Sequence, residues 1–449
     1  MSFSKPIPPL KIAVVGAGIS GLSAAWLLSK RHDVTLYEGD KYFGGHTRTV
    51  DVTVNGVTHP VDTGFLVFNK RTYPNLTALF ACLGVGVVES EMTFSVSLAE
   101  NGIEWSGSSL ATLFAQKRNL VRGEFLKMVG DILRFNKETS RLAGSPAEEG
   151  LTLGEFLDRR HFSRPFRDWY LMPMAAAIWS CPTAQMLEYP LSTFVRFCRN
   201  HGLLQLTNRP QWLTVRGGAR TYVDAIIRAM ADVRLAAPVQ HVERDAASVW
   251  VHDGRQRERY DALVLACHSD QALALLGEGA SGEERAVLEK IRYQPNRAVL
   301  HHDPALLPRL RSVWSAWNYS AGHGTKDSHP VSVSYLINRL QPVPFDVPVV
   351  VSLNPHTQPR AEHTVAEFEY SHPLFDRAAI EAQRRVPSLQ GRRNTWFCGA
   401  WTGYGFHEDG LQSALAVANS MGVSAPWQGD LADDRVAFGP RPSLAGAVW

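Results

Sequence analysis

KIAVVGAGISGLSAAWLLSKRHDVTLYE, residues 11–38, is the stretch of the chain that decides its fold. It begins with a short apolar run at 11–15, which is typical of a buried parallel strand. Residues 22–30 then show helical apolar spacing, and VTLY at 34–37 predicts a second strand that ends at Glu38. This order of strand, turn, helix and strand predicts a Rossmann-like α/β unit.

The turn after the first strand reads GAGISG, with glycines at Gly16, Gly18 and Gly21. The first glycine permits a tight turn, and the second lets backbone N–H groups approach a pyrophosphate. The third lets the helix pack closely on the strand. Glu38 can accept hydrogen bonds from ribose hydroxyls, and the helix N-terminus around Ser20 favours an anion. The pattern therefore predicts a dinucleotide-binding site.

A second match to the same glycine pattern, GEGASG, occupies residues 277–282. It follows the helical-looking stretch DQALALL instead of a strand, and no acidic residue follows at the distance needed for a ribose. We predict a loop there, and hence one dinucleotide site in the chain.

A glycine pair lies just beyond Glu38, in GDKYFGGHTR at 39–48. This block resembles the second FAD signature of the flavin amine oxidase and phytoene desaturase superfamily. There, the pair lets the loop pass close to the FAD phosphates and the flavin. The resemblance implies FAD as cofactor, with contacts from Gly44, Gly45, His46 and Thr47. The superfamily usually carries arginine at the position of His46.

Three later blocks extend the resemblance in the same order. VDTGF at 61–65 is similar to a segment that lies beside the flavin in the superfamily. VRGGARTY at 215–222 is similar to the superfamily's glycine-led start of a helix, and it precedes APVQHV at 237–242. The superfamily's counterpart of Val239 in this block holds the adenine. TWFCGAWTGYGFHEDGLQSA at 395–414 is similar to a closing strand, loop and helix whose N-terminus points at the flavin. The further FAD contacts implied by the resemblance are Ser20, Gly64, Phe65, Val239, Gly399, Glu408, Asp409, Gly410 and Leu411.

The order of these blocks predicts two interwoven domains and a tail. The insertion after the first block looks helical, as in RGEFLKMVGDILRFNKETSRLA, whereas the second insertion alternates as strands do. This suggests a mixed sheet under a helical cap. We expect an FAD-binding domain from 1–75, 210–275 and 390–425, a substrate-binding domain from 76–209 and 276–389, and a loosely packed tail at 426–449.

Two residues are candidates for a catalytic role. Amine oxidases of the superfamily place a lysine on the strand that faces flavin N5, and aligning NRAVLHHD puts Arg297 there. Arginine does not release a proton, and a surface position for Arg297 stays open. His407 aligns with one member of an aromatic pair over the flavin, so the cage for an amine is incomplete.

The closing helix leaves two roles open for His407. A neutral histidine beside the flavin could accept or return a proton, or it could form a wall of the pocket. The acids that follow it, Glu408 and Asp409, complement a helix dipole whatever the function.

The charge, hydropathy and cysteine content of the chain bear on its possible partners and location. Lys and Arg number 46 against 43 Asp and Glu, a net charge of +3, which is too balanced to argue for nucleic acid or a polybasic membrane patch. No apolar run reaches the ~18–20 residues of a membrane span, although a peripheral membrane contact through Trp449 stays open. The N-terminus lacks a signal-peptide pattern, and five scattered cysteines without a CxxC pair predict neither a metal site nor a disulfide framework. We expect a cytoplasmic protein.

Segments between the FAD blocks indicate the reaction. MPMAAAIWSCP at 172–182 resembles a bacterial group of FAD oxidoreductases, some of which modify fatty acyl chains, and QGRRNT at 390–395 is similar to a flavin-dependent fatty acid isomerase. The resemblance implies an oxidoreductase that takes a hydride from an activated C–H of an unsaturated fatty-acyl or other lipid-like substrate, by desaturation or double-bond isomerisation. Two alternatives remain: an amine oxidase releasing imine and hydrogen peroxide, and a non-catalytic flavin- and lipid-binding protein. The electron acceptor is left open.

Overall fold

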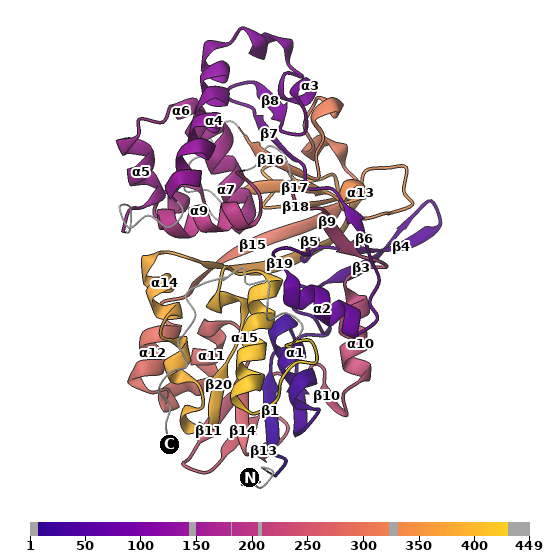
Figure 1. Ribbon diagram of the computed structural model, residues 1–449. Helices are drawn as coiled ribbons and strands as arrows, with labels where there is room; N and C mark the ends of the chain where they lie inside the picture. The colour runs from indigo at the N-terminus through magenta and orange to yellow at the C-terminus, as the bar shows by residue number, and fades with distance from the viewer. Residues whose placement is uncertain (1–7, 143–149, 181, 205–208, 323–330, 430–449) are drawn as a thin grey trace.

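The computed structural model describes residues 8–142, 150–180, 182–204, 209–322 and 331–429, which form two lobes (Figure 1). The lower lobe is built on a parallel five-stranded sheet in the order β10-β2-β1-β14-β20. Its strands, from three separated parts of the chain, confirm the predicted Rossmann-like α/β fold. They are β1 (Lys11–Val15), β2 (Asp33–Tyr37), β10 (Asp232–Arg234), β14 (Ala262–Leu265) and β20 (Thr395–Phe397).

Helices cover one face of this sheet. They are α1 (Ile19–Leu28), α10 (Arg220–Arg228) and α15 (His407–Ser420), and their apolar side chains share one core cluster with the strands. Every residue of α1 is buried, because α15 packs on the side of α1 that the sheet leaves free. A helix that is apolar on all sides is expected in such an interior position.

The other face carries a second layer with its own core cluster. An antiparallel meander and three helices form it, and residues 277–282 join two of these helices, as the predicted loop requires. The elements are β11 (His241–Arg244), β12 (Val249–His252), β13 (Arg257–Tyr260), α11 (Ser269–Leu276), α12 (Gly282–Leu288) and α14 (Arg377–Gln383).

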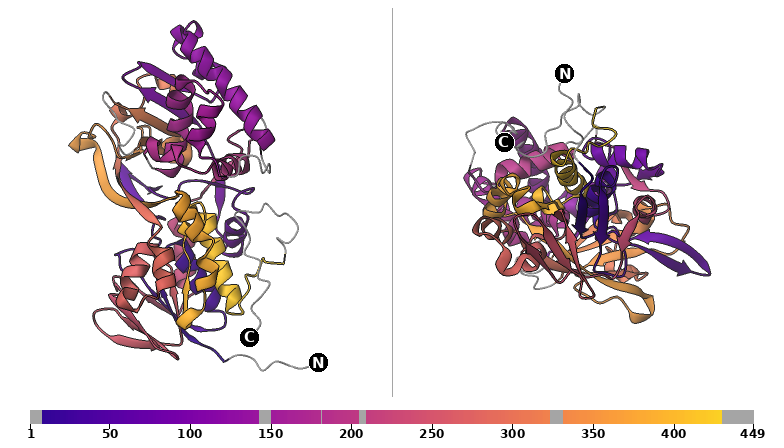
Figure 2. Two further views of the ribbon diagram at one scale, coloured as in Figure 1. Left: turned by 90° about the vertical axis from the view of Figure 1, so that its left-hand side faces the viewer. Right: turned by 90° about the horizontal axis from the view of Figure 1, so that it is seen from below.

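The upper lobe is a seven-stranded sheet in the order β19-β15-β18-β17-β16-β7-β8, packed against helices (Figures 1 and 2). Two of its strands, β7 and β8, come from the insertion that looked helical in the sequence. The strands are β7 (Phe94–Leu98), β8 (Ile103–Ser106), β15 (Arg292–His301), β16 (Trp317–Ala321), β17 (Ser332–Leu336), β18 (Val350–Leu353) and β19 (Thr364–Leu374). The main helices are α3 (Leu110–Leu113), α4 (Gly123–Leu142), α5 (Leu153–Arg159), α7 (Met172–Trp179) and α9 (Leu191–Asn200).

Short elements lie between the two lobes. The hairpin of β3 (Thr49–Val54) and β4 (Val57–Asp62) follows the second glycine loop, and β5 (Phe68–Asn69), β9 (Trp212–Val215) and β6 (Val87–Ser90) form a small sheet. The helix α2 (Pro74–Cys82) packs against α15 of the lower lobe. Parts of both insertions, α2, α12 and α14, thus lie with the lower lobe.

The last described residues pack on the same lobe. The Trp427 ring stacks on Trp26 of α1 at 6.2 Å between centroids, and its indole N–H donates to the Asn75 side-chain oxygen at 3.2 Å. Residues 430–449 of the expected tail, including Trp449, lie outside the described residues. In the part of the chain that the structure describes, no helix combines the length and apolarity needed to cross a membrane.

Candidate functional site

The glycine loop after β1 leaves open space at the start of α1. Gly16 has a φ of +102°, and a Cβ on Gly21 would overlap the Gly16 carbonyl oxygen, so both positions need glycine. A Cβ on Gly18, by contrast, would meet no described atom within 4 Å. Gly18 is the N-cap of α1, and this helix end has no side-chain cap and no acid in its first turn. A free helix N-terminus facing open space suits a phosphate group.

Glu38 lies at the end of β2, within reach of this loop. Its carboxylate accepts hydrogen bonds from the backbone N–H groups of Ala17 and Asp40, both at 2.9 Å. The N–H of Ala237 donates to the Glu38 carbonyl at 2.8 Å, which brings the following half-buried Val239 to the same end of the sheet. The two residues expected to hold ribose and adenine are therefore neighbours.

The second glycine loop docks on the first. The Gly44 N–H donates to the Ala17 carbonyl at 2.8 Å, and a Cβ on Gly45 would lie 3.1 Å from the Cα of Gly18. Gly44 and Gly45 have φ values of +119° and +58°, which favour glycine. Both predicted loops thus border the space beside Gly18.

The segment at Gly64 and Phe65 packs on the backbone of His46. The Phe65 N–H donates to the His46 carbonyl at 3.0 Å, and a Cβ on Gly64 would overlap that carbonyl. The Phe65 ring stacks on His407 with 3.8 Å between centroids. Thr47 Oγ1 links the loop to His407 Nε2 at 2.8 Å. The structure therefore brings these two predicted segments to the start of α15.

The N-termini of α1 and α15 meet through small residues. A Cβ on Gly410 would lie 2.7 Å from Ser20 Oγ, so only glycine allows this approach of the two helices. Leu411 is fully buried beneath the contact. Gly399, just before the closing loop, donates its N–H to Ser413 Oγ of α15 at 2.9 Å. Two helix N-termini therefore direct their positive ends at one region.

The two acids after His407 have protein partners. Glu408 accepts from the Asn75 side-chain amide at 2.7 Å and from the Leu76 N–H at 3.0 Å, which caps α2. Asp409 accepts from the Phe406 N–H at 2.9 Å and caps its own helix. Burial raises the pKa of both carboxyls, that of Asp409 to about 7. Their contact with FAD stays a prediction.

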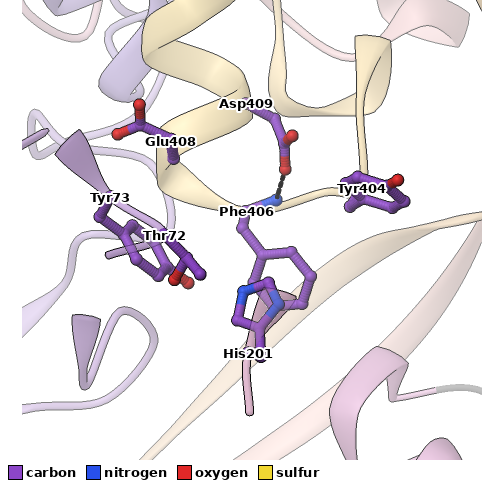
Figure 3. A pocket seen from close by; sticks show the side chains of 7 residues that line it. All are labelled: Thr72, Tyr73, His201, Tyr404, Phe406, Glu408 and Asp409. Atoms are coloured by element: carbon purple, nitrogen blue, oxygen red, sulfur yellow. Dashed lines mark hydrogen bonds between the residues drawn. The ribbon is translucent and has the colours of Figure 1, made fainter. Parts of the chain in front are cut away.

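A small pocket opens at the start of α15 on the side of the upper lobe (Figure 3). Most of its walls are aromatic, and His201 stacks on Phe197 at 4.0 Å beside it. Burial lowers the pKa of His201 to about 4, so this wall is neutral at pH 7. The lining residues are Thr72, Tyr73, His201, Tyr404, Phe406, Glu408 and Asp409.

Four histidines from separate segments converge near the glycine loops. The His46 ring lies 5.3 Å from His372 and 6.1 Å from His268, and its electrostatic environment also includes His407. Burial lowers the pKa of His372 to about 4 and that of His407 to about 3, and it holds the pKa of His46 well below its usual range. All four residues have intermediate exposure, and burial also lowers the pKa of His268, so they form a neutral wall.

Hydrogen bonds fix the tautomer of His372. The Asn354 side-chain oxygen accepts the Arg297 backbone N–H, so its amide nitrogen donates to Asn296 Oδ1 at 2.7 Å. The Asn296 amide nitrogen donates to the Gln294 carbonyl and, at 2.8 Å, to His372 Nδ1. Since Nδ1 accepts, the neutral ring carries its proton on Nε2.

The structure does not bring Arg297 to this wall. Its guanidinium binds Glu367 at 2.6 and 2.9 Å and Gln358 at 2.6 Å, on the outer face of β15. The buried residue that faces inward here is Asn296. Strand alternation is the signal that could have found it, because Asn296 shares its face with the apolar Ala298 and Leu300.

One group in the described part of the chain has metal-ligand spacing, although the sequence predicted no metal site. His241, Glu243 and His252 lie on the outer meander, with the two imidazoles stacked at 3.8 Å. Arg257 binds Glu243 at 2.7 Å and already supplies a positive charge there. The group lies on β11 and β12, away from the glycine loops.

Comparison with known proteins gives a family and a fold. The sequence profile of the family described as flavin containing amine oxidoreductase matches residues 19–302. A carotenoid phi-ring synthase of Chlorobaculum tepidum is 24% identical over 70% of the chain, and one of Streptomyces griseus is 26% identical over 66%. The chain spans 48% and 62% of the length of these relatives. A polyenoic fatty acid isomerase of Ptilota filicina is 34% identical over 25% of the chain and 22% of its own length.

Solved structures share the fold at low identity. A CLA-producing fatty acid isomerase from P. acnes gives a TM-score of 0.66 at 16% identity, covering 94% of this chain and 100% of that one. Cyclohexylamine oxidase from Brevibacterium oxydans gives 0.65 at 17% identity, covering 92% and 100%. Both lobes therefore follow an arrangement found in solved proteins.

Proposed function

The chain belongs to the flavin-containing amine oxidoreductase family and uses FAD, and on that basis we propose that it takes a hydride from an activated C–H bond of an unsaturated, lipid-like substrate. The space beside Gly18, the two glycine loops and Glu38 would hold the FAD phosphates and ribose. The start of α15 would lie beside the flavin ring. The aromatic pocket next to it would receive the substrate.

The neutral wall is the observation that carries this proposal. The histidines around His46 have pKa values lowered by burial, and the acids Glu408 and Asp409 are occupied with backbone N–H groups. An ammonium substrate would lose hydration, and the neutral histidines offer it no negative charge in return. An apolar chain would lose nothing by entering, and burying it against Tyr404 and Phe406 is favourable.

The relatives support the same class of substrate. Their names denote carotenoid phi-ring synthases and a polyenoic fatty acid isomerase, and a fatty acid isomerase shares the fold. Carotenoids and polyenoic acids have several double bonds, whose allylic C–H bonds are activated. The second candidate is an amine oxidase, favoured by the family description and by the fold shared with cyclohexylamine oxidase.

FAD, when bound, supplies the acceptor for the hydride. The residues of the chain would hold the reacting carbon in place and exclude water. His407 donates or accepts a hydrogen bond with Thr47 and is packed on Phe65. With a pKa of about 3 it is a poor proton acceptor at neutral pH. We therefore assign His407 to the neutral histidine wall, where it would orient the substrate.

Two outcomes of hydride removal conserve atoms and electrons. In desaturation, the adjacent carbon loses a proton and two electrons leave to an external acceptor. In isomerisation, the hydride returns to another carbon of the same chain, so no acceptor is consumed. Oxygen uptake distinguishes amine oxidation from isomerisation, because only the former must pass its electrons onward.

Anaerobic mixing with candidate substrates tests the proposal. We expect a polyunsaturated fatty acid or a carotenoid precursor to bleach the flavin absorbance or to change its own double-bond spectrum, whereas cyclohexylamine and putrescine leave both unchanged. Bleaching by the amines alone would establish the second candidate. Lipid binding with neither spectral change would identify a non-catalytic lipid carrier.

The variant His407→Ala separates the roles of that residue. If His407 only forms part of the histidine wall, its replacement should weaken the apparent affinity for the substrate. The rate of flavin reduction should then keep the same dependence on pH between 5 and 9. A proton carrier would instead lower the rate of flavin reduction by ~10²–10⁴ and remove a pH step. Thr47→Val is a companion variant, which removes the hydrogen-bond partner of both His407 and Tyr222 and keeps the imidazole ring.

A further inference from the structure

Large apolar side chains on the described surface gather in one short segment. Of the eight that are exposed, five lie between residues 110 and 133, with Leu110 at 77% and Val121 at 85% exposure. Leu120, Leu126 and Leu133 are about half exposed. A single exposed leucine needs no explanation, whereas a cluster of this kind marks an interaction surface.

The helix α4 has a buried apolar face and a separate exposed one, so its exposed leucines are not part of the core. Its inward stripe, with Phe125, Met128 and Phe135, is fully buried in the core of the upper lobe. Leu126 and Leu133 lie seven residues apart on another face, which packing within the lobe leaves in solvent. The helix thus has a second apolar stripe that the fold itself does not use.

The segment that carries the exposed apolar side chains is also rich in positive charge. Residues 110–137 contain six lysines and arginines against two acids, Glu124 and Asp131, while the whole chain has a net charge of only +3. The acids form ion pairs with Arg122 and Arg134. The remaining cations of the segment are Lys117, Arg118, Lys127 and Lys137.

The segment forms the end of the upper lobe. In Figure 1, the purple part of the chain that includes α3 and α4 lies at the top of the molecule, and the Rossmann sheet lies at the bottom. Figure 2 shows the same end protruding after a quarter turn. A flat surface can therefore touch this end without meeting the lower lobe.

We propose that this tip patch, Leu110, Leu120, Val121, Leu126 and Leu133 with the cations around them, docks on the surface of an anionic lipid bilayer. Leu120 and Val121, flanked by Arg118 and Arg122, enter the boundary between headgroups and acyl chains. The cations pair with lipid phosphates and acidic headgroups. This docking role goes beyond the proposed function, and it would bring the upper lobe to the phase in which lipid-like molecules dissolve.

The composition of the tip patch favours a bilayer over a protein partner. Cores of protein interfaces are enriched in aromatic residues and depleted in lysine. The tip patch has the reverse composition, since its most exposed apolar residues are aliphatic and Lys117 and Lys127 lie among them. Aliphatic side chains with a basic rim are the composition of proteins that lie on anionic membranes.

Vesicle flotation of the full-length holoprotein tests the proposal. We expect the protein to float with vesicles of phosphatidylcholine and phosphatidylglycerol, and to bind pure phosphatidylcholine much less. The double variant Leu120→Ser and Val121→Ser should weaken binding by at least ~10-fold, because two aliphatic side chains no longer leave water. Lys117→Gln and Lys127→Gln should each cost about fivefold and reduce the effect of salt.

The matched control is Val365→Ser, which changes an exposed valine at 39% exposure on β19, outside the tip patch. It should leave flotation unchanged, and all variants should retain FAD and the wild-type melting temperature. Absence of flotation with anionic vesicles would overturn the proposal, and so would equal flotation of the double variant. A dimer that the double variant dissociates, in the absence of any vesicle binding, would assign the patch to a second copy of the chain instead. None of these outcomes depends on the identity of the substrate.

Discussion

The glycines at the closest contacts of the lower lobe and those of α4 in the upper lobe have different surroundings. In the lower lobe, Gly16, Gly21 and Gly410 lie where a Cβ would crowd or overlap backbone or a neighbouring helix. In the upper lobe, a Cβ added to Gly123 or Gly130 of α4 would have no described atom within 4 Å, and packed aromatic side chains determine the structure instead. The lower lobe is therefore specified by a few backbone positions, and the upper lobe by the volume and polarity of many side chains.

The change Gly21→Val should have the largest effect. Its Cβ would overlap the Gly16 carbonyl at the closest approach of α1 to the sheet, and α1 is buried on all sides. We expect little folded protein and no bound flavin. Soluble yield and circular dichroism measure this, and a folded, yellow Gly21→Val protein would contradict the contrast between the lobes.

The change Gly18→Val separates folding from cofactor binding. A side chain at Gly18 meets open space in the protein, so the chain should fold with a near-normal spectrum. The same side chain would occupy the position expected for a phosphate, so the protein should be purified without FAD. Absorbance at the flavin band, compared with wild type, is the measurement. Full FAD occupancy would place the phosphates elsewhere.

The free energy of unfolding should depend on pH through His372 on β19. His372 has a pKa of about 4, below the 6.5 of an unfolded histidine, so the unfolded state binds more protons between these values. Stability from this group is present above pH 6.5 and is lost as pH falls toward 4, by ~1.4 kcal/mol per pH unit at most.

Replacing Asn296 with aspartate tests this dependence. The new carboxylate would accept a hydrogen bond from a protonated His372 Nδ1 and stabilise the charged ring, so the His372 pKa rises and the loss of stability in acid becomes smaller. Melting temperatures from pH 4 to 7 measure the change. Ring nitrogen shifts of labelled histidine should move from the Nε2–H form to a ring protonated at Nδ1. Asn394→Asp, just before β20, is the control for added charge.

The smallest effect is expected for Gly130→Ala in α4. Glycine inside a helix costs ~0.5–1 kcal/mol relative to alanine, and Gly130 has open space around it. The variant should therefore be more stable than wild type by that amount and keep its FAD. Chemical unfolding monitored by tryptophan fluorescence provides the value. Destabilisation would show that α4 is packed against something other than its own lobe.

Features formed by residues close together in the chain could be predicted from the sequence, whereas contacts between distant segments could not. The strands β1 and β2, both glycine loops and the approach of Glu38 to the loop are local patterns, and each was predicted from residues close together in the chain. The partners of Glu408 at Asn75 and Leu76 were missed because no local pattern connects residues so far apart. Strand β7 was missed because its pairing with β16 joins the two insertions.

The inward position of Asn296 was missed for another reason. A strand with two buried faces gives only a weak alternation, since Val299 and His301 on the other face are buried as well. The exposed Pro295, and Arg297 with its partner Glu367, show that this face reaches solvent at one end. The histidine wall likewise depends on four segments that meet in the folded chain, and no spacing in the sequence predicts such a meeting.

The contact between Ser20 and Gly410 has a consequence for how the protein is made. The ribosome produces β1 and α1 well before α15, so α1 is covered only once residues 407–420 have been made. Until then, the apolar surface of α1 is exposed on the nascent chain, where a chaperone can bind it. The expected flavin site would likewise be incomplete until the N-termini of both α1 and α15 are present. FAD would then join the chain only after α15 has been made.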